Sequence, residues 1–272
     1  MLNAASPGCV VFGGGALGSA VARLAHASGE AVVVASRNPG SHPGWWRRCG
    51  LDADSRVAWL PRGVHVVVAV GPAPHEAWTS ISPVAKIFYR LTHYSPQSLV
   101  VAVPAGRLGE VAEVVALAAA ARDAGASVVR VGPLFGVGDG YLSRQVMVLR
   151  GGGTVLCPKV GPTRILCADD AARVVLRARG AANDLTISGF ERVSADDATN
   201  VLVGRFGGQV RTPMLGDGLH RNARARLSAW SDLPDSWDED SFGPRLSLAD
   251  WVARLPGPRR RAGEPSHGAP AG

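Results

Sequence analysis

The feature that most constrains this chain is a glycine-rich loop between a short apolar strand and a helix near the amino end. Four apolar residues, 9–12, run into Gly13-Gly-Gly-Ala-Leu-Gly18, and residues 19–28 have the pattern of a buried or amphipathic helix. In such a loop the first glycine permits a tight turn, the second lets the backbone approach a ligand, and the third lets the helix pack on the strand. The N–H groups that open the helix attract an anion. The pattern therefore predicts a pyrophosphate site made by Gly13, Gly15, Ala16, Leu17 and Gly18.

The residues after the next predicted strand, 31–35, indicate which dinucleotide this loop would bind. Ser36 and Arg37 stand about 20 residues beyond the loop, where an acid would bind the ribose 2′-hydroxyl of NAD. A guanidinium beside a hydroxyl suits the 2′-phosphate of NADP instead. We therefore expect Ser36 and Arg37 to select NADP, with NAD as the alternative cofactor. Because the chain has 34 glycines, a plain glycine loop followed by a surface arginine is the competing interpretation.

Strand and helix patterns alternate along most of the remaining chain. Valine-rich runs at 64–70, 99–103 and 127–131 are typical of strands buried on both faces of a parallel sheet. Helical patterns at 75–91 and 110–124 separate them, and Gly125 ends the second helix. The sequence thus predicts an α/β fold with a doubly wound parallel sheet, the Rossmann fold. Ligands of such sheets bind at the carboxyl ends of the strands, where Gly71 and Pro133 are further candidate cofactor contacts.

Composition favours a cytoplasmic protein without a membrane or nucleic-acid partner. Hydrophobic residues make up 46% of 272 residues, which is enough for a sizeable core, and no apolar run approaches the ~18 residues of a membrane span. The four cysteines and seven histidines have no metal-ligand spacing. The net charge of +7 is accompanied by no recognition motif, and Arg259-Arg-Arg261 belongs to a predicted disordered tail, 256–272.

Beyond the glycine loop, three later segments resemble one enzyme family. They are Val128-Val-Arg-Val-Gly-Pro-Leu-Phe-Gly136 with Gly138-Asp-Gly140, Ile165-Leu-Cys-Ala-Asp-Asp-Ala-Ala-Arg173, and Leu185-Thr-Ile-Ser-Gly189. In this order they resemble extended and atypical short-chain dehydrogenases/reductases, the NAD-dependent epimerase/dehydratase group, over about residues 8–215. The resemblance implies a dinucleotide-binding domain over 8–180, a strand near 185–189 that returns to it, and a small helical substrate lobe over 190–255. It also implies a small-molecule substrate and a possible homodimer.

The family's usual catalytic pair is missing from this sequence. Members carry Tyr-x-x-x-Lys on the helix after the fifth strand, but residues 110–124 contain neither residue type. Hydride transfer to a carbonyl needs a proton donor or a group that stabilises the oxyanion. Tyr141 is the substitute that the resemblance favours, because it follows the loop that passes the nicotinamide in family members, and Asp139 or Ser143 could assist it. The alternative is that Tyr141 only packs or lines a pocket.

Two further groups of residues have competing interpretations. The resemblance suggests Arg144 and Arg164, together with Asp139, as contacts for an anionic, nucleotide-linked substrate, although solvated surface arginines fit the same pattern. Asp169-Asp170 precedes an alanine-rich helix and is expected to stabilise its amino end rather than to catalyse. The function predicted from these residues is a reductase or an epimerase-type oxidoreductase. The alternative is a non-catalytic dinucleotide-sensing or scaffold protein.

Overall fold

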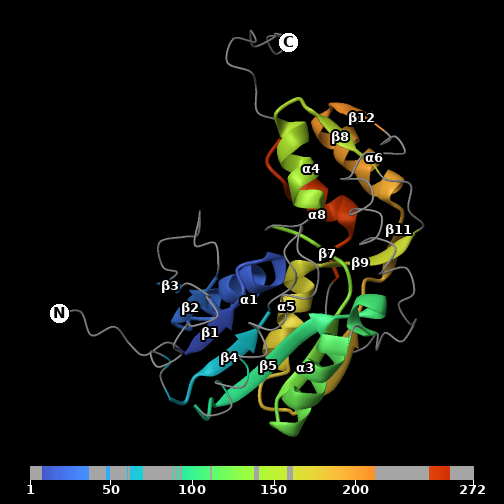
Figure 1. Cartoon of the computed structure of the whole chain (residues 1–272). Coiled ribbons are helices and arrows are strands. Elements are labelled where there is room, and N and C mark those ends of the chain that lie inside the picture. The colour runs from blue at the N-terminus through green and yellow to red at the C-terminus, as the bar shows by residue number, and fades with distance from the viewer. Residues whose placement is uncertain are drawn as a thin grey trace, which may run out of the picture.

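The computed structural model describes residues 8–36, 47–49, 60, 62–69, 88, 91, 94–110, 112–137, 141–157, 162–211 and 245–257. Its centre is a parallel sheet of seven strands in the order β10-β6-β5-β4-β1-β2-β3. The chain moves outward from β1 to β3 on one side and returns to β4 on the other side of β1 (Figure 1). The strands are β1 (Cys9–Phe12), β2 (Val32–Ala35), β3 (Arg47–Cys49), β4 (His65–Val68), β5 (Ser98–Pro104), β6 (Ser127–Val131) and β10 (Asp184–Ile187).

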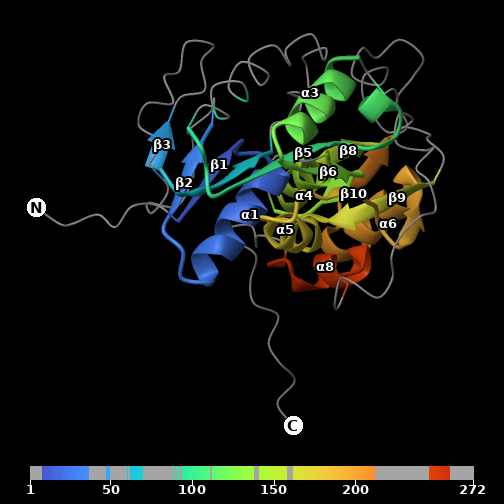
Figure 2. The ribbon, with the colours of Figure 1, turned by 90° about the horizontal axis from the view of Figure 1, so that it is seen from below.

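Helices cover both faces of this sheet. Helices α1 (Ala16–Ala27) and α5 (Ala168–Arg177) pack together on one face, and α3 (Ala112–Asp123) lies on the other (Figure 2). Valines alternate between the two resulting cores: Val11 and Val67 face α1 and α5, whereas Val10 and Val66 belong to the opposite core. The chain thus has the doubly wound Rossmann fold that its alternating pattern predicts.

A second, smaller set of elements packs beyond the carboxyl ends of the strands (Figure 1). Its core includes Phe135 and Trp251, whose rings meet edge to face with centroids 5.6 Å apart. The helices are α4 (Tyr141–Arg150), α6 (Ala195–Phe206) and α8 (Leu248–Arg254). The strands are β7 (Leu134–Phe135), β8 (Thr154–Leu156), β9 (Thr163–Cys167), β11 (Glu191–Val193) and β12 (Gln209–Arg211), and the 3-10 helix η3 (Gly106–Glu110) follows β5.

This lobe is built from both sides of the expected domain division at residue 190. Its core joins α4 and β8, from within 8–180, to α6 and α8. The sequence region after 190 supplies α6, which begins at a capping box formed by Ser194 and Asp197 and ends before Gly207. A local pattern cannot reveal that α4 packs on a helix that begins more than 40 residues later in the chain, because that contact is tertiary.

Most of the expected elements are present, but the structure also differs from the prediction, since β7, α4, β8, β11 and β12 were not predicted. The edge strand β3 lies where no strand is predicted, α1 begins at Ala16 rather than at residue 19, and η3 separates β5 from α3. Most of the expected helix 75–91 and nearly all of the tail 256–272 lie outside the described residues. In the described part of the chain, no helix is both long enough and apolar enough to cross a membrane.

Candidate functional site

The glycine loop connects β1 to α1 in a geometry that only small residues permit. Gly13 is buried and has φ +116°, a conformation that L side chains rarely adopt. A Cβ on Gly18 would lie 1.8 Å from the carbonyl oxygen of Gly13, so the helix is pressed directly onto the turn. Gly15 is open instead: apart from its neighbours in the sequence, the described residues place no atom within 4 Å of the position that a Cβ would take. The loop is thus closely packed where Gly18 meets Gly13, and it has open space beside Gly15.

The amino end of α1 is left open to an anion. Gly15 is its N-cap residue, no side chain caps it among the described residues, and its first turn holds no acid. By contrast, α3, α5, α6 and α8 all carry Asp or Glu in their first turn. Acids in those positions offset the positive end of the helix dipole. The dipole of α1 therefore stays available to a ligand with negative charge.

The loop lies at the point where the strand order reverses. Gly13 N donates to Ala35 O of β2 at 2.8 Å, and Ala69 N donates to Phe12 O at 2.8 Å from the β4 side. Open parallel sheets bind ligands in the crevice at such a switch point. Ser36 follows β2 directly and is half-buried at this edge. Arg37 and Gly71 lie outside the described residues.

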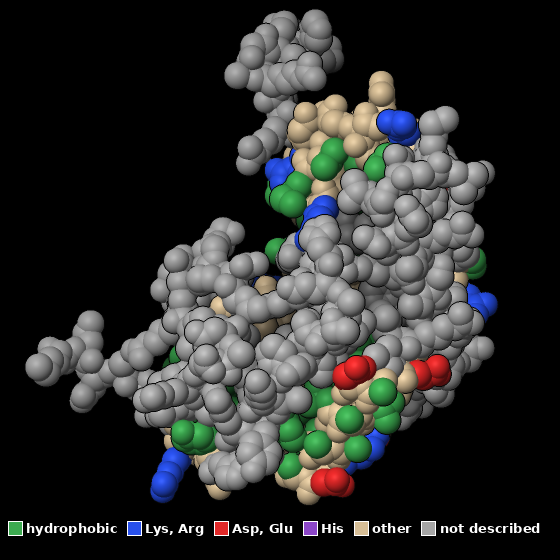
Figure 3. Space-filling model, in the orientation of Figure 1, with side chains coloured by type: hydrophobic (Ala, Val, Ile, Leu, Met, Phe, Trp, Pro, Cys, Tyr) green, Lys and Arg blue, Asp and Glu red, His purple; other side chains and the backbone are tan. Residues whose placement is uncertain are grey.

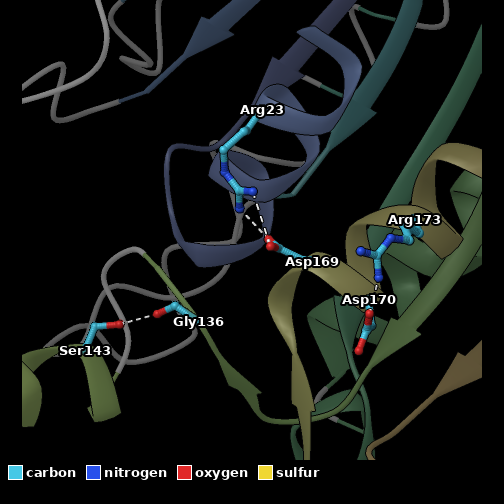
Figure 4. A network of polar contacts seen from close by, with 6 residues as sticks. All are labelled: Arg23, Gly136, Ser143, Asp169, Asp170 and Arg173. Atoms are coloured by element: carbon cyan, nitrogen blue, oxygen red, sulfur yellow. Dashed lines mark hydrogen bonds and ion pairs between the residues drawn. The ribbon is translucent and has the colours of Figure 1, made fainter. Parts of the chain in front are cut away.

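The segment after β6 is pinned at the same edge of the sheet. Gly132 N donates to Ile187 O at 2.9 Å, and Pro133 O accepts from Leu166 N at 2.8 Å. Gly136 has φ +147°, and a Cβ there would lie 2.9 Å from the Ala168 Cβ. The Ser143 hydroxyl donates to Gly136 O, which ties α4 to this segment (Figure 4). Gly13 and Pro133, distant in sequence, thus stand at one edge.

The two acids at the start of α5 have structural partners. Asp169 accepts from both terminal nitrogens of Arg23 on α1, one of them at 3.2 Å, and Asp170 pairs with Arg173 (Figure 4). Asp170 also accepts from the backbone N–H of Leu246 at 3.0 Å. The N-cap residue of α5 is Cys167, so the acids occupy the first turn rather than the cap position. They join α1, α5 and the segment that leads into α8.

The predicted substrate residues lie in the lobe. Tyr141 opens α4, and its backbone alone is described; Arg144 is half-buried on the same helix; Asp139 lies outside the described residues. Arg164 belongs to β9, and its Nη1 is 3.5 Å from the carbonyl oxygens of both Gly189 and Phe190. Helix α4, like α1, has no acid in its first turn. The structure brings Tyr141 and Arg144 onto one helix and puts Arg164 in a separate strand.

The helix after β5 has the sequence Ala112-Glu-Val-Val-Ala-Leu-Ala-Ala-Ala-Ala-Arg-Asp123, with neither Tyr nor Lys. Its outer side exposes alanines and Val115 between acidic residues (Figure 3). Helix α3 therefore carries no phenol or ammonium group.

Three of the cysteines are described, and all are buried. Burial raises the pKa of Cys9 and of Cys157 to about 11, and it also raises the pKa of Cys167. Such thiols stay protonated and unreactive at neutral pH. Within the described ranges, no group of three or more His, Cys, Asp or Glu residues could hold a metal ion.

One residue of α1 has a role at the loop that the sequence pattern does not reveal. The Ser19 hydroxyl donates to Gly14 O, next to Gly15, at 3.0 Å. The only signal in the sequence is a serine placed immediately after the third glycine, and nothing there indicates which carbonyl it would reach.

Comparison with known proteins finds similarity in structure alone. No protein-family model matches the chain, and no curated protein matches it in sequence. Among solved structures, MoeE5 in complex with UDP-glucose and NAD superposes with a TM-score of 0.65 at 16% identity, covering 90% of this chain and 96% of that one.

Two further solved structures are similar at the same level. UDP-glucose 4-epimerase from Thermotoga maritima, solved with UDP-glucose, has a TM-score of 0.63 at 15% identity over 90% of this chain and 96% of the other. The Bordetella bronchiseptica enzyme WbmG, in complex with NAD and UDP, has a TM-score of 0.59 at 14% identity over 93% and 95%. The chain therefore shares its Rossmann fold, along nearly its whole length, with these proteins.

Proposed function

We propose that this protein binds a nicotinamide dinucleotide at the carboxyl edge of its sheet and acts as a reductase or an epimerase-type oxidoreductase. The observation that carries the proposal is the loop: Gly13 with positive φ, Gly18 pressed onto it, and Gly15 open above an uncapped, acid-free helix end. A bound pyrophosphate would accept hydrogen bonds from the N–H groups of Gly15, Ala16 and Leu17. The bound cofactor would supply hydride exchange with the substrate.

The proposed cofactor is NADP, with NAD as the alternative. Ser36 stands at the carboxyl end of β2, and Arg37 follows it in the sequence. A guanidinium there would neutralise a 2′-phosphate. MoeE5 and WbmG were solved with NAD, so the preference for NADP rests on Ser36 and Arg37.

The proposed substrate is small and nucleotide-linked. Of the α-helices whose first turn is described, α1 and α4 are the two without an acid there. With α1 assigned to the cofactor, the amino end of α4 is suited to a second anion, and Arg144 lies one turn into that helix. Arg164 is the other candidate contact. The relatives of similar fold were solved with UDP or UDP-sugars.

The proton donor in this proposal is Tyr141, at the first position of α4, with Asp139 and Ser143 in support. Pro133 would border the nicotinamide end of the cofactor, and Gly71 would border the crevice from the β4 side.

The absence of Tyr and Lys from α3 favours the rival function, a dinucleotide-sensing or scaffold protein. A homodimer is also proposed, and the apolar outer side of α3 is its candidate interface.

Calorimetric titration of nucleotide-free protein with NADPH and NADH tests the proposal. We expect micromolar or tighter binding of NADPH and weaker binding of NADH. Arg37→Asp should weaken NADPH binding by about tenfold or more, because a positively charged hydrogen-bond donor is replaced by a carboxylate that repels the negatively charged 2′-phosphate.

The control for the change in net charge is Arg62→Asp. Arg62 is exposed just before β4, at the opposite edge of the sheet, and its replacement should leave the NADPH/NADH ratio unchanged. An unaltered ratio in Arg37→Asp would remove Arg37 from the 2′-phosphate site. Failure of the wild-type protein to bind either dinucleotide would overturn the proposed function.

A further inference from the structure

The hydrogen bond made by Ser19 differs from those made by the hydroxyls of Ser28 and Thr199. Ser28 and Thr199 donate to the carbonyl four residues earlier, Leu24 O at 3.0 Å and Ala195 O at 2.8 Å, which is the usual bond of a serine or threonine in a helix. Ser19 instead reaches five residues back, to Gly14 O, outside the helix. Its backbone N–H makes the ordinary helical bond to Gly15 O at 2.9 Å. The hydroxyl therefore acts on the loop rather than on α1.

The bond fixes a peptide unit that is otherwise free to rotate. The peptide between Gly14 and Gly15 joins two glycines, and residues without a Cβ allow such a unit to turn over at little cost. On one side the loop is already held, since Gly13 N donates to Ala35 O and Gly13 O lies against Gly18. On the outer side, the described residues beyond its chain neighbours place no atom within 4 Å of the Cβ position of Gly15. Ser19 supplies the missing restraint.

The orientation of the carbonyl decides where the neighbouring N–H points. A trans peptide is planar, and its C=O and N–H point in opposite directions. Because Ser19 draws Gly14 O toward α1, the N–H of Gly15 is directed away from Ser19, toward the open side of the loop. Within the described part of the chain, this N–H makes no hydrogen bond. It is therefore a donor held in place and left available.

We propose that Ser19 is a positioning residue of the dinucleotide site: its hydroxyl holds the Gly14–Gly15 peptide with the N–H of Gly15 facing the pyrophosphate. This inference rests on the proposed function, since it assigns Ser19 a task at the same site. Ser19 itself does not touch the ligand. Its effect is confined to ligand groups that accept the N–H, which are the phosphates.

The test compares Ser19→Ala with wild type by calorimetry, with NADPH, ADP and adenosine as probes. One hydrogen bond of this kind is worth about a three- to tenfold change in affinity. Ser19→Ala should weaken NADPH and ADP by that factor and leave adenosine, measured by competition or NMR, within twofold of wild type. A general structural defect would weaken all three ligands alike.

The matched control is Ser28→Ala, which removes a hydroxyl bond of the same 3.0 Å length from the other end of the same helix. It should leave all three affinities within twofold. Ser19→Thr keeps the hydroxyl and should restore NADPH affinity. Equal NADPH affinity in Ser19→Ala and wild type, or equal losses for adenosine and ADP, would overturn the role of Ser19 while leaving the proposed function intact. If wild type binds none of the probes, the proposed function itself is wrong.

Discussion

At the scale of single residues, the glycines of the first loop have unequal roles. Gly18 has no room for a side chain, because a Cβ would meet the backbone oxygen of Gly13 at 1.8 Å. That oxygen belongs to a turn held by the bond between Gly13 N and Ala35 O, so it has little freedom to move aside. Gly204 on α6 has open space instead: outside its own helix backbone, no atom of the described residues lies within 4 Å of its Cβ position.

Gly18→Ala is therefore expected to destabilise the protein by about 1–3 kcal/mol, the usual cost of overpacking a buried site. It should also weaken dinucleotide binding, because the loop must shift. Gly204→Ala should instead stabilise by about 0.5 kcal/mol, since alanine restricts the unfolded chain and favours a helix. Urea denaturation of both variants measures the difference. Equal stabilities would contradict the close contact between Gly18 and the turn.

At the scale of elements, the carboxyl end of α6 contacts both of the other helices of the lobe. Arg205, in the last turn of α6, donates to Leu255 O just beyond α8 at 3.2 Å. A Cβ on Gly208, just beyond α6, would lie 2.6 Å from Leu149 Cδ2 on α4. Each of the three helices of the lobe carries one arginine in its last turn: Arg150, Arg205 and Arg254. Each arginine offsets the partial negative charge at the carboxyl end of its own helix.

Arg205→Ala should lower the free energy of unfolding by about 1 kcal/mol at low ionic strength, because it removes both the bond to Leu255 O and the charge at the helix end. The loss should shrink in high salt. The comparison variant is Arg211→Ala, on the exposed strand β12 and outside the last turn of α6; it should change stability little. Urea denaturation at two salt concentrations checks both. A loss for Arg205→Ala that did not depend on salt would argue against the dipole contribution.

At the scale of the whole molecule, a polar cluster joins the parts of the chain at the amino edge of the sheet. Arg179, beyond α5, donates to both carboxylate oxygens of Glu30 at 2.8 and 2.9 Å and to the Cys9 sulfur at 3.0 Å. His65 on β4 lies within the field of the same two charges, and its Nδ1 is 2.7 Å from Ser98 Oγ. Burial lowers the pKa of His65, Arg179 lowers it further, and Glu30 acts in the opposite direction.

A lowered pKa makes His65 a source of acid sensitivity. As the pH falls through about 6.5, the imidazole of the unfolded chain takes up a proton before that of the folded protein. The contribution of neutral His65 to the free energy of unfolding is therefore complete above this pH. It decreases as the pH falls from about 6.5 to the pKa of His65 in the folded protein. His65→Asn should reduce the slope of stability against pH between about 7 and 5. The control is His26→Asn, at the exposed end of α1. This variant should keep the part of the slope of stability against pH that comes from His65. Thermal unfolding at several pH values between about 7 and 5 measures this slope. An unchanged slope in His65→Asn would contradict the prediction.

Much of this architecture could be predicted from local sequence. Val-rich runs of strand length identify the central strands, and β6 has its predicted bounds, 127–131. Gly125 ends α3 with φ +71°, as expected of a glycine after a helix. The conformations of Gly13 and Gly18 follow from their spacing as well. These features depend on neighbours in the sequence, and the sequence displays them directly. The cofactor contacts of the loop remain predictions.

What the sequence alone determined is the order of strands and helices, the doubly wound sheet and the turn at the first loop, because hydrophobic periodicity and glycine conformation are local properties. Tertiary structure alone decided that α4 packs with α6 and α8, that Asp169 pairs with Arg23 across 146 positions, and that the Ser19 hydroxyl reaches Gly14. The edge strand β3, missed by pattern, pairs with β2. Such contacts depend on which surfaces meet once the chain has folded, and on directions of side chains and peptides that no spacing in the sequence specifies.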